Sequence, residues 1–199
     1  MPGPLVDVEM GVAVLLLSGP LPAAWPAGVS QTHDMEFFLR YFVELPLPMA
    51  AIDWALDELP PEWIVMAANK AHERGLGFMV NADPHAGADL AGAVVVVGME
   101  PAARRGSTTL RTMAWALIGP TSAQPLLDAD LEIGSIGQRR TQLAVAGRYY
   151  VPGSRTHRHP DRGTAQRVGE ATIKEFVDAL ADLVLRRALG RSVSAAAIA

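Results

Sequence analysis

The sequence predicts an α+β fold in which a curved antiparallel sheet of about six strands wraps around a long C-terminal helix, with two short helices after the first strand. Two patterns predict it. Residues 128–149 alternate between polar and apolar side chains on both sides of a glycine-containing turn, which is typical of a hairpin with one buried face. Residues 164–189 carry an apolar stripe of helical period, and no other predicted helix is long enough to cover a sheet.

The chain before the hairpin supplies the remaining elements in order. Residues 36–45, EFFLRYFVEL, alternate as a strand does, and the following prolines end that strand. Two helices are expected at 49–56 and 61–74, the second with proline in its first turn and Gly75 just past its end.

After Gly75 we expect strands and turns. A short strand over Leu76–Ala82 leads through a loop to a strand over Leu90–Met99. A further strand over Thr108–Pro120 places Arg111, Met113, Trp115 and Leu117 on one side, and the hairpin follows it.

The last helix is expected from about Thr164 to Leu189, with Gly190 as its stop. Its polar face predicts two i,i+4 ion pairs, Lys174–Asp178 and Asp182–Arg186.

Three segments divide the chain. Residues 1–34 form an extension rich in Pro, Gly and Ala that is weakly structured or adds one strand at Gly11–Leu17. This apolar run is too short to span a bilayer, and no Lys or Arg precedes Arg40, so we expect neither a signal peptide nor stable membrane insertion. The folded domain is expected over 35–190, and 191–199 read as a tail.

Composition narrows the function classes. The 199 residues are 50% hydrophobic and 19% charged, with a net charge of -4, which argues against a nucleic-acid partner. The absence of cysteine rules out disulfides and thiolate chemistry, and it fits a cytoplasmic location.

Four segments also resemble a known group of proteins. They are FVELPLPMAAIDWAL (Phe42–Leu56), LLDADLEIGSIG (Leu126–Gly137), RTQLAVAGRYYVP (Arg140–Pro152) and RVGEATIKEFVDALADLV (Arg167–Val184). Their order is similar to the helix-grip fold of the SRPBCC superfamily, also called START/Bet v 1-like, and closest to its polyketide cyclase/dehydrase and lipid-transport branch. The resemblance implies a hydrophobic cavity that accepts a lipid, sterol or polyketide-like molecule. It transfers no catalytic residue, because no single catalytic constellation runs through that superfamily.

The expected function is therefore binding or transport of a hydrophobic small molecule in a cavity between the sheet and the C-terminal helix. Plain hydrophobic core is the competing interpretation for the same inward-facing side chains. Buried Tyr and Trp are favoured as ligand contacts, because each carries a polar atom that needs a partner. The expected ligand-binding residues are Tyr41, Trp63, Met79, Trp115, Leu117, Ile133, Val145, Tyr149, Ile173, Phe176, Val177 and Leu180.

Two alternatives stay open. A cyclase or dehydratase would need an acid–base pair inside the cavity, for which the sequence offers Tyr41, Tyr149 and Arg111. A protein-interaction or co-chaperone-like module would have a filled core and an exposed apolar patch instead of a cavity.

Two polar clusters are candidates for further sites. His157, His159 and Asp161 have metal-like spacing, but neighbouring arginines favour a solvated loop or a contact to an anionic head group at the cavity mouth. The carboxylates Asp128, Asp130 and Glu132 lie opposite the apolar side of their strand, where exposed charge is expected. We predict no metal, no cofactor and no catalytic residue.

Overall fold

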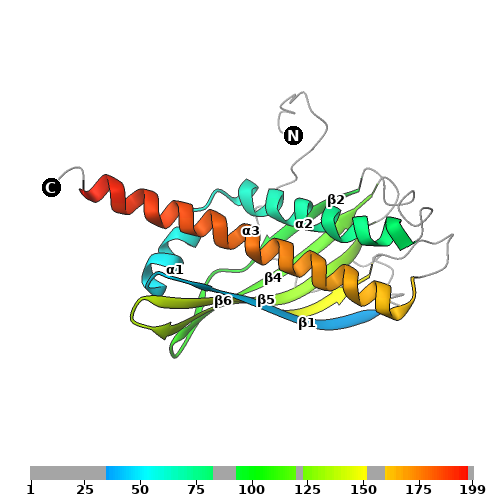
Figure 1. Cartoon of the computed structure of the whole chain (residues 1–199), viewed down its shortest axis with the longest axis horizontal. Coiled ribbons are helices and arrows are strands. Elements are labelled where there is room, and N and C mark those ends of the chain that lie inside the picture. Colours follow the sequence, from blue (N-terminus) through cyan, green and yellow to red (C-terminus); the bar gives the residue numbers. More distant parts are fainter. Residues whose placement is uncertain (1–34, 83–92, 120–122, 152–159, 197–199) are drawn as a thin grey trace, which may run out of the picture.

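The computed structural model describes residues 35–82, 93–119, 123–151 and 160–196 (Figure 1). Within these ranges the chain forms six strands and three helices. They are β1 (Glu36–Leu45), α1 (Met49–Asp57), α2 (Pro61–Ala82), β2 (Val94–Met99), β3 (Ala103–Arg105), β4 (Thr108–Ile118), β5 (Ala123–Gly137), β6 (Arg140–Tyr150) and α3 (Arg162–Ala196).

The predicted fold class is confirmed. One antiparallel sheet has the strand order β1-β6-β5-β4-β2, and β3 pairs with β4 beside this path. The sheet is curved, and α3 runs across it, with α2 beside α3 (Figure 1). The C-terminal end of α3 extends beyond the strands in that view.

The core lies between the sheet and the helices. Inner-face residues pair across the strands, so that Leu127 of β5 stands between Trp115 of β4 and Tyr149 of β6. Trp115 also meets Phe176 of α3 edge to face, with ring centroids 4.7 Å apart. At Gly169 of α3, an added Cβ would lie 2.9 Å from the Tyr149 ring, so the helix backbone sits directly on that side chain.

The alternation read from the sequence matches the burial of the strands. In β5, Ala129, Leu131 and Ile133 are buried, whereas Asp128 and Asp130 are exposed. The acidic cluster of β5 therefore faces away from the core, as expected.

One predicted strand is wrong. Residues 76–82 continue α2, which does not stop at Gly75. Gly75 is instead the point where α2 touches α3, because a Cβ there would collide with the Thr172 hydroxyl and lie 3.1 Å from the Val168 carbonyl oxygen. The glycine that looked like a helix stop is a contact residue between two helices.

Asn69 joins α2 to the edge of the sheet. Its Nδ2 donates to the carbonyl oxygens of Val65 and Val95, each at 2.9 Å, and its Oδ1 accepts the Val95 N–H at 2.8 Å. Val95 belongs to β2, which ends the strand order on this side. The amide thus satisfies backbone groups on the open edge of β2 and covers that edge with a helix.

The start of α3 lies close to its predicted position, whereas its end lies beyond the predicted one. Asp161 caps the start, since its carboxylate accepts the Thr164 N–H at 3.0 Å and the Thr164 hydroxyl at 2.7 Å. These bonds lower the pKa of Asp161. At the other end the predicted stop at Gly190 is wrong, because the helix continues to Ala196.

Several expectations fall on residues outside the described ranges: the strand at Gly11–Leu17, the remainder of the segment 1–34, and the pair His157 and His159. Among the described helices, none has both the length and the apolar character needed to cross a membrane.

The contact at Gly75 leads to a stability prediction with an internal control. We expect Gly75→Ala to lower the free energy of unfolding by about 1–3 kcal/mol, because the new methyl group overpacks the boundary between α2 and α3. Gly77, two residues further along the same helix, has no heavy atom within 4 Å of an added Cβ. Gly77→Ala should therefore stabilise the protein by about 0.5–1 kcal/mol. Urea unfolding measures both, and equal effects of the two changes would contradict this packing.

Candidate functional site

A groove of about 890 Å³ opens between α1, α2 and the C-terminal half of α3. We call it the interhelical groove. Its apolar lining comes from all three helices and comprises Trp54, Trp63, Met66, Ala67, Ala179 and Leu183. Its charged lining comprises Lys70, Asp182, Arg186 and Arg187.

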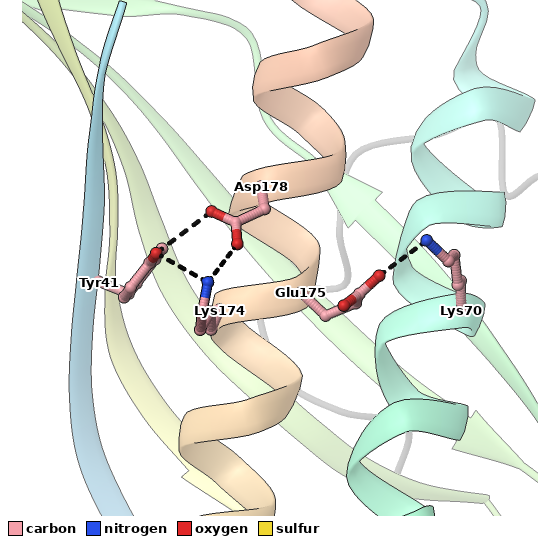
Figure 2. A network of polar contacts seen from close by, with 5 residues as sticks. All are labelled: Tyr41, Lys70, Lys174, Glu175 and Asp178. Atoms are coloured by element: carbon pink, nitrogen blue, oxygen red, sulfur yellow. Dashed lines mark hydrogen bonds and ion pairs between the residues drawn. The ribbon is translucent and has the colours of Figure 1, made fainter.

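The packing of α2 on α3 explains where the groove lies. The two helices touch at Gly75, and the next turns are joined by an ion pair between Lys70 and Glu175 at 2.7 Å (Figure 2). That contact also raises the pKa of Lys70. Beyond this pair, the small side chains of Ala67 and Ala179 leave space between the helices.

Large apolar side chains stand in this space in contact with solvent. Trp63 is 43% exposed and Met66 is 65% exposed. Trp54 of α1 lies under the guanidinium of Arg187, which is 5.5 Å from the ring centroid. Indole rings present a large apolar surface together with one polar atom, so this lining suits a ligand that is mostly apolar.

The cations of the groove are not equivalent. Lys70 pairs with Glu175, and Arg187 pairs with Glu58 at 3.2 Å. The predicted pair between Asp182 and Arg186 is not formed, and Arg186 makes no ion pair with any residue that the structure describes.

A second hollow, of about 570 Å³, lies over the N-terminal half of α3. There the predicted pair between Lys174 and Asp178 is confirmed and includes Tyr41 of β1 (Figure 2). The Tyr41 hydroxyl donates to Asp178 at 3.2 Å and accepts from Lys174 at 3.2 Å. The hydrogen bond to Asp178, followed by that to Tyr41, raises the pKa of Lys174 to about 12. The Lys174 ammonium thus serves as a hydrogen-bond donor to both Tyr41 and Asp178.

The structure places the twelve expected ligand-binding residues in three environments. Trp63 lines the interhelical groove and is exposed, which corrects its prediction as an inward-facing residue: it lies on the side of α2 that borders the groove. Tyr41 is partly buried at the second hollow, which Ile173 also borders. Ten of the twelve, Ile173 among them, belong to the hydrophobic core: Met79, Trp115, Leu117, Ile133, Val145, Tyr149, Ile173, Phe176, Val177 and Leu180.

The core contains buried polar atoms that have no hydrogen-bond partner among the described residues. The Trp115 Nε1, the Tyr149 hydroxyl and both ring nitrogens of His72 are buried without a hydrogen-bond partner among the described residues. Burial raises the pKa of Tyr149 to about 12, although the neighbouring Thr172 hydroxyl opposes this shift. The Thr172 hydroxyl itself donates to the Val168 carbonyl at 2.8 Å.

The groups suggested for acid–base chemistry occupy separate contacts. Tyr41 is bound to Lys174 and Asp178, and Tyr149 packs against Gly169. Arg111 of β4 pairs with Asp57 of α1 and is 9% exposed. Its pairing holds α1 against the sheet, so we interpret Arg111 as a structural residue.

The metal-like cluster is represented by Asp161 alone, which serves as the cap of α3. Over the parts of the chain that the structure describes, no three His, Cys, Asp or Glu side chains come together as a metal site would require.

Sequence reasoning missed most of the interhelical groove. Trp54, Met66, Leu183 and Arg186 are lining residues that were not predicted. The available signal was weak: Trp63 and Met66 lie three residues apart and share one face of α2, but nothing local says that this face borders a groove.

A scan of protein-family models finds none that matches this chain, and a search of the curated proteins finds no significant match. The resemblance to the SRPBCC superfamily therefore stays a prediction.

His72 leads to a pH prediction. Burial lowers its pKa from 6.5 to about 4. Between these values the unfolded chain holds a proton that the folded protein lacks, so stability falls as the pH drops through this window, by up to about 3 kcal/mol. We expect His72→Leu to remove this part of the acid sensitivity. Urea unfolding from about pH 7.5 down to about pH 4 compares the two proteins, whose carboxylate titrations are shared. Parallel stability profiles would show that His72 is not buried in the neutral form.

Proposed function

We propose that this protein binds a hydrophobic small molecule in the interhelical groove. The observation that carries the proposal is a groove of about 890 Å³ in which Trp63 and Met66 keep large apolar surfaces in water. This volume lies within the roughly 300–1,000 Å³ typical of small-molecule sites.

The lining supports apolar recognition. A ligand in the groove would remove the surfaces of Trp63, Met66 and Leu183 from water, which stabilises the complex by about 25 cal/mol for each Å² of apolar area. Met66 adds an unbranched, polarizable side chain that adapts to ligands of different shape. The proposed ligand class, lipid, sterol or polyketide-like, is the one that the family resemblance implies.

The proposed site differs from the expected cavity between the sheet and α3. The edge-to-face contact of Trp115 with Phe176 and the seating of Gly169 on Tyr149 favour the core interpretation for these residues. The groove uses another side of the same helix, where α3 faces α2 and α1.

A protein-interaction module is the second candidate, and one observation favours it. Four large apolar side chains of α2, Trp63, Met66, Phe78 and Val80, are each exposed by at least 40% of their area. A closely packed core together with such an apolar surface is what this hypothesis requires. Enzymatic activity has no comparable support, because the groups suggested for acid–base chemistry, Tyr41, Tyr149 and Arg111, lie in separate contacts.

The test uses phenylnaphthylamine, a neutral fluorophore that brightens in apolar sites. We expect saturable binding to the full chain, weakened about tenfold by Trp63→Ala because the indole supplies part of the contact area. Phe78→Ala is the matched control, since Phe78 is a similarly exposed aromatic residue of α2, at 41%, that does not line the groove.

Binding that does not saturate, or an equal loss in both variants, would count against a groove site. Light scattering behind size-exclusion chromatography separates the second candidate. Self-association that Trp63→Ala abolishes, without saturable fluorophore binding, would favour the protein-interaction module.

A further inference from the structure

We propose that the ligand of the interhelical groove is an anionic amphiphile whose head group is bound by the guanidinium of Arg186. The proposal rests on the function proposed above and names the charge of the ligand. It depends on one asymmetry in the groove, namely that its cations differ in what they already contact.

Two of the three cations are occupied. Lys70, at the end of the groove nearer to Gly75, donates to Glu175 at 2.7 Å. Arg187 is held twice, by Glu58 at 3.2 Å and by the ring of Trp54 at 5.5 Å. An incoming anion would have to displace a carboxylate from either cation, so neither is a ready binding site.

Arg186 is exposed at the groove and makes no ion pair within the described part of the chain. Its guanidinium presents donors in a planar fork that matches the two oxygens of a carboxylate or phosphate. Because the apolar side chain of Leu183 lies one turn before it on α3, an acyl chain and its head group can be bound by adjacent turns of one helix.

Asp182 is the one acidic residue in the lining, and it opposes an anion. Its charge is partly balanced, because Lys70 lies close enough that Asp182 raises its pKa. Within the part of the chain that the structure describes, no carboxylate lies in ion-pair contact with Arg186. Asp182 and Arg186 are therefore the two charged side chains of the lining that form no ion pair among the described residues, and of these two only the Arg186 guanidinium attracts an anion.

The test compares three probes with ten-carbon chains: decanoate, decanol and decyltrimethylammonium. Each displaces phenylnaphthylamine from the full-length protein, well below the concentration at which micelles form. We expect decanoate to bind at least about tenfold more tightly than decanol, as a charge-assisted hydrogen bond implies. This preference should shrink as ionic strength rises, because the site is exposed.

Arg186→Gln should reduce the ratio between decanoate and decanol affinities to about one, because it removes the guanidinium charge. Arg167→Gln is the matched control, since Arg167 is an exposed arginine of the same helix outside the groove, and it should keep the wild-type ratio. Equal affinity for decanoate and decanol, or a preference for the ammonium probe, would overturn the anionic assignment while the groove itself still binds. Failure of the fluorophore to bind at all would instead remove the proposed function.

Discussion

The contact between α2 and α3 at Gly75 is the constraint on which the rest of the structure depends. Because Gly75 has no side chain, the Thr172 hydroxyl and the Val168 carbonyl of α3 come against the backbone of α2. Asn69 then fixes the same helix to the edge of β2, so α2 is held on two sides. With its position set in this way, the bulky residues at the start of α2 border a space that the small residues near them do not fill.

The local patterns predicted most of the fold, since hydrophobic period reports directly which face of an element is buried. They failed in a segment whose apolar residues fit the period of a strand as well as that of a helix. The stretch from Leu76 to Ala82 is short and partly apolar, so it suited a strand as well as a helix, and Gly75 before it had the usual form of a stop signal. The role of Gly75 as a contact residue depends on Thr172, which is remote in the sequence and meets Gly75 only in the folded protein.

The site was less predictable than the fold, for a related reason. A pattern of inward-facing Trp, Tyr and Phe does not distinguish a filled interior from a ligand cavity, because both bury the same residues. The ring of Phe176 against Trp115 favours a filled interior, and this contact depends on how closely α3 approaches the sheet. Trp63 was the one predicted contact that lines the interhelical groove. Arg186 was predicted to pair with Asp182 on the surface. In the described part of the structure its guanidinium forms no ion pair, and the sequence pattern does not indicate this.

The topology has a consequence for how the protein acquires its groove. The walls contributed by α2 and α3 are separated in the sequence by every strand from β2 to β6. Contacts of such high sequence separation are slow to form, because a large loop must close before they stabilise anything. The groove is therefore assembled only after α3 has been synthesised and has docked. Until then the apolar surface of α2 has no neighbour on that side, and an emerging chain is most prone to aggregate during this interval.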